Sequence, residues 1–277
     1  MTAVGTDRGR SGDGLGSLLR HWREVRSASQ LGLALDAGIS QRHLSFIESG
    51  RSVPSRPTLT SIMQALDVPL RERNAAFLAA GYAPVYSESA WNAKEMQGIT
   101  RALERMLRQH DPFPAVVMDR YWNVVSANAS SPRFFGSFID MAARKGPRNM
   151  LHLIFDPTGM RPFVVDWESV ARSLVQRVYR ETVGRVMDQP TQALLDELFA
   201  YPDVDASWRL RGSVAVAPNL PMIPLGFKKD GKTLNYFSMV TSVGAPQSVA
   251  AQELRVESLF PADDGTEAFH ATWMSSG

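Results

Sequence analysis

Apolar residues recur every three to four positions along much of the first eighty residues, the spacing that gathers them on one face of an α-helix. The first such face consists of Leu15, Leu18, Leu19, Trp22 and Val25. Ser29 precedes a second helical segment that Gly38 ends, and Ser40 precedes a third. Two more segments follow, in TLTSIMQALDV and LRERNAAFLAAGY. The pattern predicts an all-α domain of five short helices over residues 15–82.

Beyond residue 82 the pattern changes to a mixture of helices and strands. The stretch YAPVYSESAW lacks periodicity and predicts a linker at 83–91. The segment 92–110 has an apolar helical face, and PAVVMDRYWNVVSAN predicts two strands around a turn. Further expected helices are 128–141, 148–155, 167–187, 190–200 and 204–210. Further expected strands are 222–228, 233–243 after the turn KKDGK, and 252–259. Strands that flank a block of helices predict an α+β domain with an antiparallel sheet over 92–277.

The composition is that of a soluble globular protein with room for two domains. The chain has 277 residues, of which 44% are hydrophobic and 21% charged. No run approaches the roughly 18 apolar residues of a membrane-spanning helix. The start, MTAVGTDRGRSGDG, is glycine-rich and lacks an apolar signal-peptide core, so we expect a disordered tail at 1–14, a cytoplasmic location and no membrane association. The absence of cysteine excludes disulfides and thiolate metal sites.

The charge is divided unevenly along the chain. Residues 1–82 contain ten arginines, no lysine and seven acidic residues, whereas residues 83–277 contain twenty basic and twenty-one acidic residues. The whole positive excess therefore lies in the first domain and is carried by arginine, the side chain best suited to bidentate contacts with phosphate or guanine. This asymmetry favours a polyanionic partner for that domain.

Residues 30–49 fit the helix-turn-helix template position by position. The template needs a small residue where its helices cross, here Ala34, and a positive φ in its turn, here Gly38. Its buried positions are Leu33, Ala37, Ile39, Leu44 and Ile47. With the ending IESGRSVPS, these residues make the segment 15–82 resemble the phage-repressor-like DNA-binding domains of the XRE (xenobiotic-response-element) family. The resemblance also implies a buried pair between Arg23 and Glu48.

The resemblance implies a double-stranded DNA operator as partner, with the N-terminal end of the third helix in its major groove. Gln41 can form two hydrogen bonds with adenine, and Arg42 two with guanine. His43 and Ser45 reach a base edge or a phosphate, although His43 reads equally well as a bystander. Phe46 departs from the polar residue that family members often carry there. It packs against thymine methyl groups or completes the core.

Three further residues are expected to hold the DNA backbone. Gln30 lies at the start of the second helix, where backbone N–H groups favour a phosphate. Arg51 and Arg56 lie in the loop after the third helix. One such domain offers few base-reading side chains, so we expect a homodimer whose interface comes from the larger C-terminal domain. Taken alone, each of these polar residues also fits an ordinary solvated helix face.

The second domain is longer than a simple dimerisation element requires. The order DPFPAVVMDRYWNVVSANASSPRFFG, NMLHLIFDP and DWESVARSLVQR, followed by a C-terminal sheet, resembles the MmyB-like ligand-binding domain over about residues 90–270. The resemblance implies a PAS-like α+β fold and a fatty-acid-like ligand. We expect no cofactor apart from such a ligand. The apolar residues suited to line a cavity for such a ligand are Phe113, Val116, Met118, Trp122, Val124, Phe134, Phe135, Phe138, Leu151, Phe155, Trp167 and Leu174. The same residues also fit a solid core. Candidates for pairing a head group are Arg133, Arg148 and Arg172.

Enzymatic motifs are missing. The chain contains no GxSxG elbow, P-loop or HExxH sequence. His152 and Asp156 are spaced to share a helix face, but two ligands do not make a metal site, and Pro157 suggests that Asp156 ends the helix. We expect no enzyme and no metal. Two function classes remain: a transcriptional regulator that senses an apolar molecule, and a constitutive DNA-binding protein whose second domain only dimerises or recruits a partner.

Overall fold

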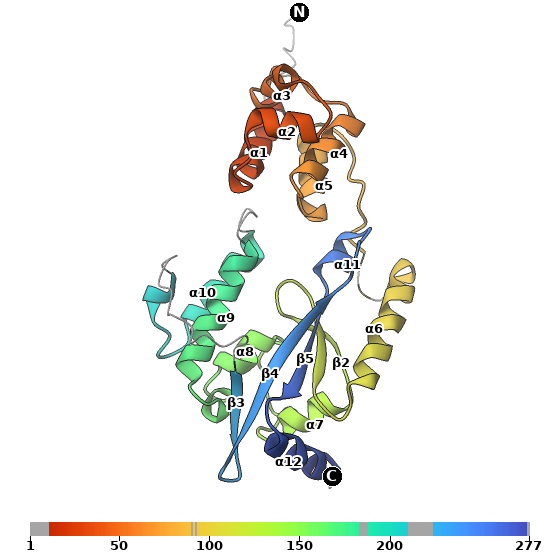
Figure 1. Ribbon diagram of the computed structural model, residues 1–277. Helices are drawn as coiled ribbons and strands as arrows, with labels where there is room; N and C mark the ends of the chain where they lie inside the picture. The colour runs from red at the N-terminus through yellow and green to blue at the C-terminus, as the bar shows by residue number, and fades with distance from the viewer. Residues whose placement is uncertain (1–10, 90, 92, 183–187, 210–223, 276–277) are drawn as a thin grey trace, which may run out of the picture. The chain divides into compact units, whose positions relative to one another are not determined.

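The computed structural model describes residues 11–89, 91, 93–182, 188–209 and 224–275, which form two compact units. Among these residues the first unit holds the helices α1–α5, and the second holds a five-stranded sheet with helices packed on it (Figure 1). No helix in the described part of the chain is both long and apolar enough to cross a bilayer. The predicted combination of an all-α domain and an α+β domain with an antiparallel sheet is confirmed.

Serine caps set the boundaries of the first unit's helices. Ser29, Ser40 and Ser55 each accept a backbone N–H from the first turn of the helix that follows, which satisfies one of its free donors. Gly38 has φ +68°, the positive value that the turn requires. The helices are α1 (Ser11–Val25), α2 (Gln30–Asp36), α3 (Gln41–Glu48), α4 (Arg56–Ala65) and α5 (Leu70–Ala79).

The core of the first unit is built from the predicted stripes. Leu15, Leu19 and Trp22 of α1 are at most 2% exposed and share one cluster with the template's buried positions. A glycine lets α1 approach α3 closely: a Cβ atom at Gly16 would lie 2.4 Å from the carbonyl oxygen of Glu48. The buried face of this unit is therefore the one that the periodicity predicts.

The chain after α5 stays attached to that helix. Asn74, which is only 2% exposed, accepts the backbone N–H groups of Val85 and Tyr86 at 3.1 and 3.0 Å. Its amide donates to the carbonyl oxygen of Tyr86 at 2.8 Å. Arg71 pairs with Glu88 at 2.7 Å. The first part of the segment 83–91 is thus held by α5.

The sheet of the second unit is entirely antiparallel, with strand order β2-β1-β5-β4-β3. Asp230 and Gly231 form the turn of the β3–β4 hairpin with φ values of 50° and 74°, as expected for the predicted KKDGK turn. The strands are β1 (Ala115–Met118), β2 (Val124–Ala127), β3 (Pro224–Lys229), β4 (Lys232–Ser242) and β5 (Arg255–Pro261).

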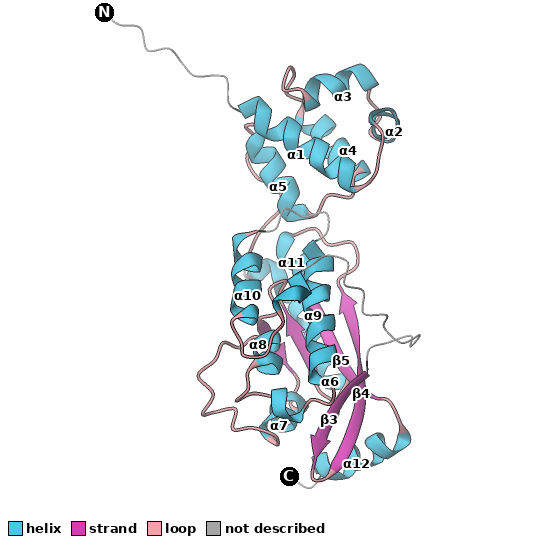
Figure 2. Ribbon diagram, turned by 90° about the vertical axis from the view of Figure 1, so that its left-hand side faces the viewer, coloured by secondary structure: helices cyan, strands magenta, loops and turns pink. Residues whose placement is uncertain are grey.

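Helices cover both faces of this sheet. The helices α8, α9 and α10 gather on one side, and α6 packs against β1 and β2 on the other (Figures 1 and 2). The longer helices are α6 (Gln97–Gln109), α9 (Trp167–Thr182), α10 (Gln189–Phe199) and α12 (Asp264–Ser275). The shorter ones are η1 (Lys94–Met96), α7 (Ser130–Gly136), α8 (Met150–Phe155), η2 (Arg161–Phe163) and η3 (Ala206–Arg209). The helix α11 (Val249–Glu253) belongs mainly to the first unit, which includes Pro246–Gln252.

Local side-chain bonds account for the elements that differ from expectation. The helix expected at 128–141 ends at Gly136, and Asp140 beyond it accepts the N–H groups of Ala142 and Ala143 in a separate turn. The strand expected from residue 252 begins at Arg255, because α11 occupies the preceding residues. The helix α12 was not expected.

Four expected helices or strands extend beyond the described residues. The parts concerned are residue 92 of the helix 92–110, 183–187 of the helix 167–187, residue 210 of the helix 204–210 and 222–223 of the strand 222–228. Residues 1–10 of the expected tail and residue 90 of the expected linker also lie outside the described residues.

Candidate functional site

The N-terminal end of α3 presents the predicted base-reading side chains. The Ser40 side chain accepts the His43 N–H at 3.1 Å, which starts the helix at Gln41. Gln41 and Arg42 are exposed, and His43 and Ser45 are half-buried. Leu44 lies on the opposite face, in the core. The local sequence therefore turns a short polar row outward from the start of α3.

Phe46 belongs to this surface rather than to the core. It is half-buried and is not part of the apolar cluster of the first unit. The guanidinium of Arg42 lies 5.4 Å from its ring centroid, and that of Arg51 lies 5.8 Å away. An aromatic ring this close to two cations restrains both of them. Phe46 thus links a predicted base reader to a predicted backbone contact.

Arg56 is held by aromatic rings in a similar way. Its guanidinium lies 5.3 Å from the ring of Tyr82 and 6.0 Å from that of Phe77. The Tyr82 hydroxyl in turn donates to the carbonyl oxygen of Pro54 at 3.0 Å. Arg56 is exposed at the first position of α4.

Glu48 ties the surface to the rest of the first unit. Arg23 donates to its two carboxylate oxygens at 2.7 and 3.1 Å, which confirms the expected pair, and Gln30 donates at 2.8 Å. Burial alone would raise the pKa of the Glu48 carboxyl, but the hydrogen bonds from Arg23 and Gln30 outweigh burial and hold the pKa below its usual range. The side-chain amide of Gln30 therefore makes an internal bond, while its backbone N–H remains at the start of α2, where a phosphate contact was predicted.

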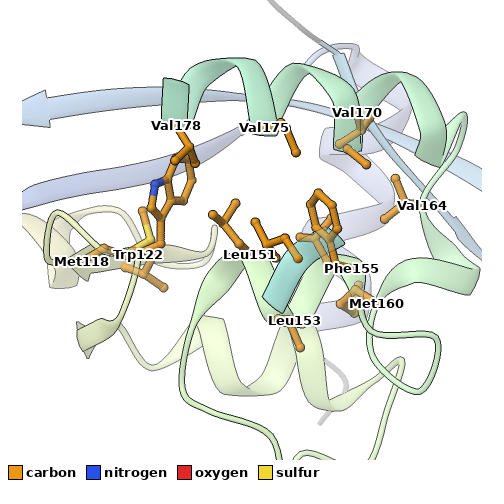
Figure 3. Packing of buried hydrophobic residues seen from close by; sticks show 14 of the residues in the cluster. Met118, Trp122, Leu151, Leu153, Phe155, Met160, Val164, Val170, Val175 and Val178 are labelled. Atoms are coloured by element: carbon orange, nitrogen blue, oxygen red, sulfur yellow. The ribbon is translucent and has the colours of Figure 1, made fainter. Parts of the chain in front are cut away.

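An apolar cavity of about 110 Å³ lies in the second unit between the sheet and the helices α8 and α9. On the sheet side it is lined by laterally paired residues of adjacent strands, Val116 with Glu257 and Ser238 with Leu259. Figure 3 shows valines of α9 pointing toward Trp122, Leu151 and Phe155 in the core around it. The lining residues are Pro114, Ala115, Val116, Trp122, Phe135, Met150, Leu151, Ile154, Val170, Ser173, Leu174, Arg177, Leu225, Phe227, Ser238, Glu257 and Leu259.

Part of the residue set predicted for a ligand lines this cavity. The lining members are Val116, Trp122, Phe135, Leu151 and Leu174. The members that pack in the same core without lining the cavity are Phe113, Met118, Val124, Phe134, Phe138, Phe155 and Trp167. Phe134 illustrates the reason, because its ring is enclosed by other aromatic rings, among them Phe135, Phe227 and Tyr236 at 5.2 to 5.6 Å. Composition alone does not distinguish such a residue from a lining one.

Four polar residues of the cavity, Ser173, Arg177, Ser238 and Glu257, were missed by the sequence analysis. The arginines suggested there for a head group do not line the cavity. Arg133 donates to the carbonyl oxygen of Met274 at 2.6 Å, Arg172 pairs with Glu168 at 3.2 Å, and Arg148 is exposed. The sequence signal that could have found Arg177 is the helical period of α9, which places residue 177 one turn beyond the lining residues 173 and 174.

His152 and Asp156 have different partners. His152 bonds Tyr201 through Nδ1 at 2.9 Å and Glu197 through Nε2 at 3.0 Å. Burial lowers the pKa of His152, and Glu197 offsets this only in part. Asp156 follows the last turn of α8 and accepts from Thr158 and Arg144. Within the described residues no group of three metal-ligating side chains comes together.

Comparison with known proteins assigns both units. The family profile described as "MmyB-like transcription regulator ligand binding domain" matches residues 99–272, and "Helix-turn-helix domain" matches residues 15–76. A solved structure of the clp gene regulator ClgR from Corynebacterium glutamicum is 24% identical. That alignment covers 37% of this chain and 95% of ClgR with a TM-score of 0.23.

An RNA-binding Light-Oxygen-Voltage receptor is 12% identical. The alignment covers 98% of this chain and 63% of the receptor, with a TM-score of 0.27. No curated protein sequence matches the chain.

Proposed function

Because the chain belongs to the family of MmyB-like transcription regulator ligand-binding domains, and carries a helix-turn-helix domain before it, we propose that it is a transcription regulator controlled by an apolar, fatty-acid-like small molecule. The two domains identify a DNA-binding regulator rather than an enzyme. In our proposal the DNA-binding domain spans 15–82 and the ligand-binding domain 92–277, with 83–91 as the linker. The tail expected at 1–14 is shorter than predicted, because α1 begins at Ser11. The observation that supports a small-molecule ligand is the apolar cavity.

DNA recognition is assigned to the exposed row on α3 and the arginines beside it. Gln41 and Arg42 read base edges, supported by His43 and Ser45. Arg51 and Arg56 contact the phosphate backbone and fix the position of the domain. Phe46 acts mainly through its ring, which holds Arg42 and Arg51 in place. Gln30 contributes its backbone N–H at the start of α2, since its side chain is bonded to Glu48.

The cavity limits the length of the ligand's buried part. A dry cavity of about 150 Å³ holds one benzene molecule, which has six carbon atoms. A volume of about 110 Å³ therefore encloses roughly four or five carbon atoms. Burial contributes about 0.8 kcal/mol per methylene, so this part of a chain binds largely through the hydrophobic effect. We propose an alkyl chain of about eight carbons, of which roughly half is enclosed.

Regulation further requires that the ligand favour one of two arrangements of the protein, because a ligand shifts an equilibrium only through differential affinity. The element proposed to respond is the helical segment 92–110, which contains α6. This helix packs against β1 and β2, and Val116 of β1 lines the cavity. A ligand that displaces β1 would change how α6 packs against the sheet. In a dimer, that change would alter the spacing of the two DNA-reading domains.

The test is a DNA titration of protein freed of bound lipid, with and without an eight-carbon ligand. An operator is first selected from random DNA, and its affinity is measured with 1-octanol, octanoate or neither. We expect a change of about fivefold or more in affinity with at least one ligand, within the usual range of coupling between sites. Mass spectrometry of an organic extract of the purified protein identifies material already bound. Unchanged affinity with both ligands would instead favour the constitutive DNA-binding protein.

A further inference from the structure

The apolar cavity has one polar region, formed by Ser173 and Arg177 of α9 and by Ser238 and Glu257 of the sheet. We propose that this region selects a ligand whose head is uncharged and donates a hydrogen bond, a hydroxyl or a primary amide, in preference to an ionised carboxylate or an ammonium group. The inference rests on the proposed function, since it assigns the head-group class of the same ligand.

Arg177 is already engaged by two acidic residues. Its Nε donates to Glu181 at 3.1 Å, and one terminal nitrogen lies 3.7 Å from Glu257 Oε2. Its guanidinium lies 4.5 Å from the centroid of the Trp122 ring. An arginine that is paired and stacked in this way is not an unpaired cation waiting for a carboxylate.

Apart from the terminal N–H groups of Arg177, which already lie beside Glu257, the cavity groups with free hydrogen-bonding capacity are neutral or negative. Glu257 Oε2 is buried and accepts no hydrogen bond from a described residue, because its 3.7 Å separation from Arg177 is too long for one. The hydroxyls of Ser173 and Ser238 also have no hydrogen-bond partner in the described part of the chain, and a hydroxyl can both donate and accept. A head group that donates one hydrogen bond and accepts another matches this set.

The surrounding charges disfavour an added anion. Arg177 belongs to a connected group of ion pairs in which Glu181 also pairs with Arg255, whose guanidinium lies 5.8 Å from the Trp122 ring. Nearby, Arg120 pairs with Asp188 and Glu253. Three arginines thus face four acids: Asp188, Glu181, Glu253 and Glu257. A carboxylate head would place another negative charge beside Glu257, and an ammonium head would lie beside Arg177.

The experiment measures by calorimetry the binding of 1-octanol, octanamide, octanoate and octylammonium to the lipid-free full chain at pH 7. We expect 1-octanol and octanamide to bind about tenfold more tightly than either charged ligand. Glu257→Gln removes the negative charge while keeping the shape of the side chain. It should improve octanoate binding by about tenfold relative to 1-octanol.

Glu168→Gln is the matched control, because it removes the same charge from an exposed position on α9 outside the cavity. It should leave the ratio between octanoate and 1-octanol unchanged. Tighter binding of octanoate or octylammonium by the wild-type chain, or an unchanged ratio in Glu257→Gln, overturns the head-group assignment while the ligand-binding function stands. Failure of all four ligands to bind at millimolar concentration contradicts the proposed function itself.

Discussion

Glu48 is the residue on which three helices of the DNA-binding domain converge. It lies on α3 and is bonded to Arg23 of α1 and Gln30 of α2, while Arg20 donates to its carbonyl oxygen at 2.9 Å. Its side chain is only 2% exposed. A buried carboxylate with this many donors stabilises the fold as long as it is ionised, and leaves Arg23 unpaired when it is removed.

Glu48→Gln should therefore lower the free energy of unfolding at pH 7 by about 2–3 kcal/mol. Because the folded-state pKa is lowered, the contribution is fully present above the unfolded pKa, which is near 4.3. It is lost as the pH falls through the folded-state value. The difference between wild type and variant should shrink from pH 7 to pH 3, measured by urea unfolding with hydrogen exchange on α1 and α3. A difference that stays constant over this range would contradict the assigned role of the charge.

Phe46 sets the second prediction at the residue scale. Phe46→Leu should relax base preference at the position read by Arg42, because the ring no longer restrains the guanidinium, at a cost of about 0.5–1 kcal/mol. Arg42→Ala should affect the same base pair by roughly 1–3 kcal/mol. Binding to a randomised operator library gives both values, and Phe46→Tyr should behave as wild type.

Arg51→Ala separates positioning from base reading. It should weaken binding to all operators alike and reduce the dependence on salt concentration. If Phe46→Leu changed preference at base pairs unrelated to those of Arg42→Ala, the proposed link between the two residues would be wrong.

At the scale of elements, α9 makes one wall of the cavity from Val170 to Arg177. Leu174→Trp adds a ring at a half-buried lining position, where empty space is already present. We expect ligand affinity to fall at least about tenfold, with a change of less than about 1 kcal/mol in the free energy of unfolding. Calorimetry with 1-octanol and urea unfolding measure the two effects.

Leu153→Trp is the control for this substitution. Leu153 is 5% exposed in the same core but does not line the cavity, so the larger ring should overpack the core and cost about 1–3 kcal/mol of stability. Equal destabilisation by both variants would show that the space beside Leu174 does not admit additional atoms.

At the scale of the whole molecule, we predict that the proposed regulator is a homodimer. The row proposed to read bases on α3 reaches only a few of them, and a two-fold pair would double these contacts on half-sites about one helical turn apart. The chain has a mass of 30.6 kDa, and sedimentation equilibrium at micromolar concentration should give twice this value. A selected operator should show inverted half-sites. A monomer with and without DNA would contradict this prediction and the proposed regulation by spacing.

Local sequence determined the elements whose signals are short-range. Ser29, Ser40 and Gly38 mark helix ends because their capping bonds and backbone angles involve neighbouring residues only. The exposed polar row of α3 follows from the same periodicity that buries Leu44, and Asp230-Gly231 specifies the β3–β4 hairpin. Even the α12 helix, which we did not expect, has a local signal in Asp263, whose carboxylate accepts the Thr266 N–H at 2.7 Å.

Only the tertiary structure decided the boundary and polar chemistry of the cavity. Whether Phe134 or Phe135 lines it depends on which rings from distant elements fill the space beside each. Arg177 and Glu257 come together because β5 pairs with both β1 and β4, and α9 then packs across that face. Strand order and register are set by contacts between distant parts of the chain, since a shift of one residue would turn Glu257 to the opposite face. Residue types and spacing along the sequence do not contain that information.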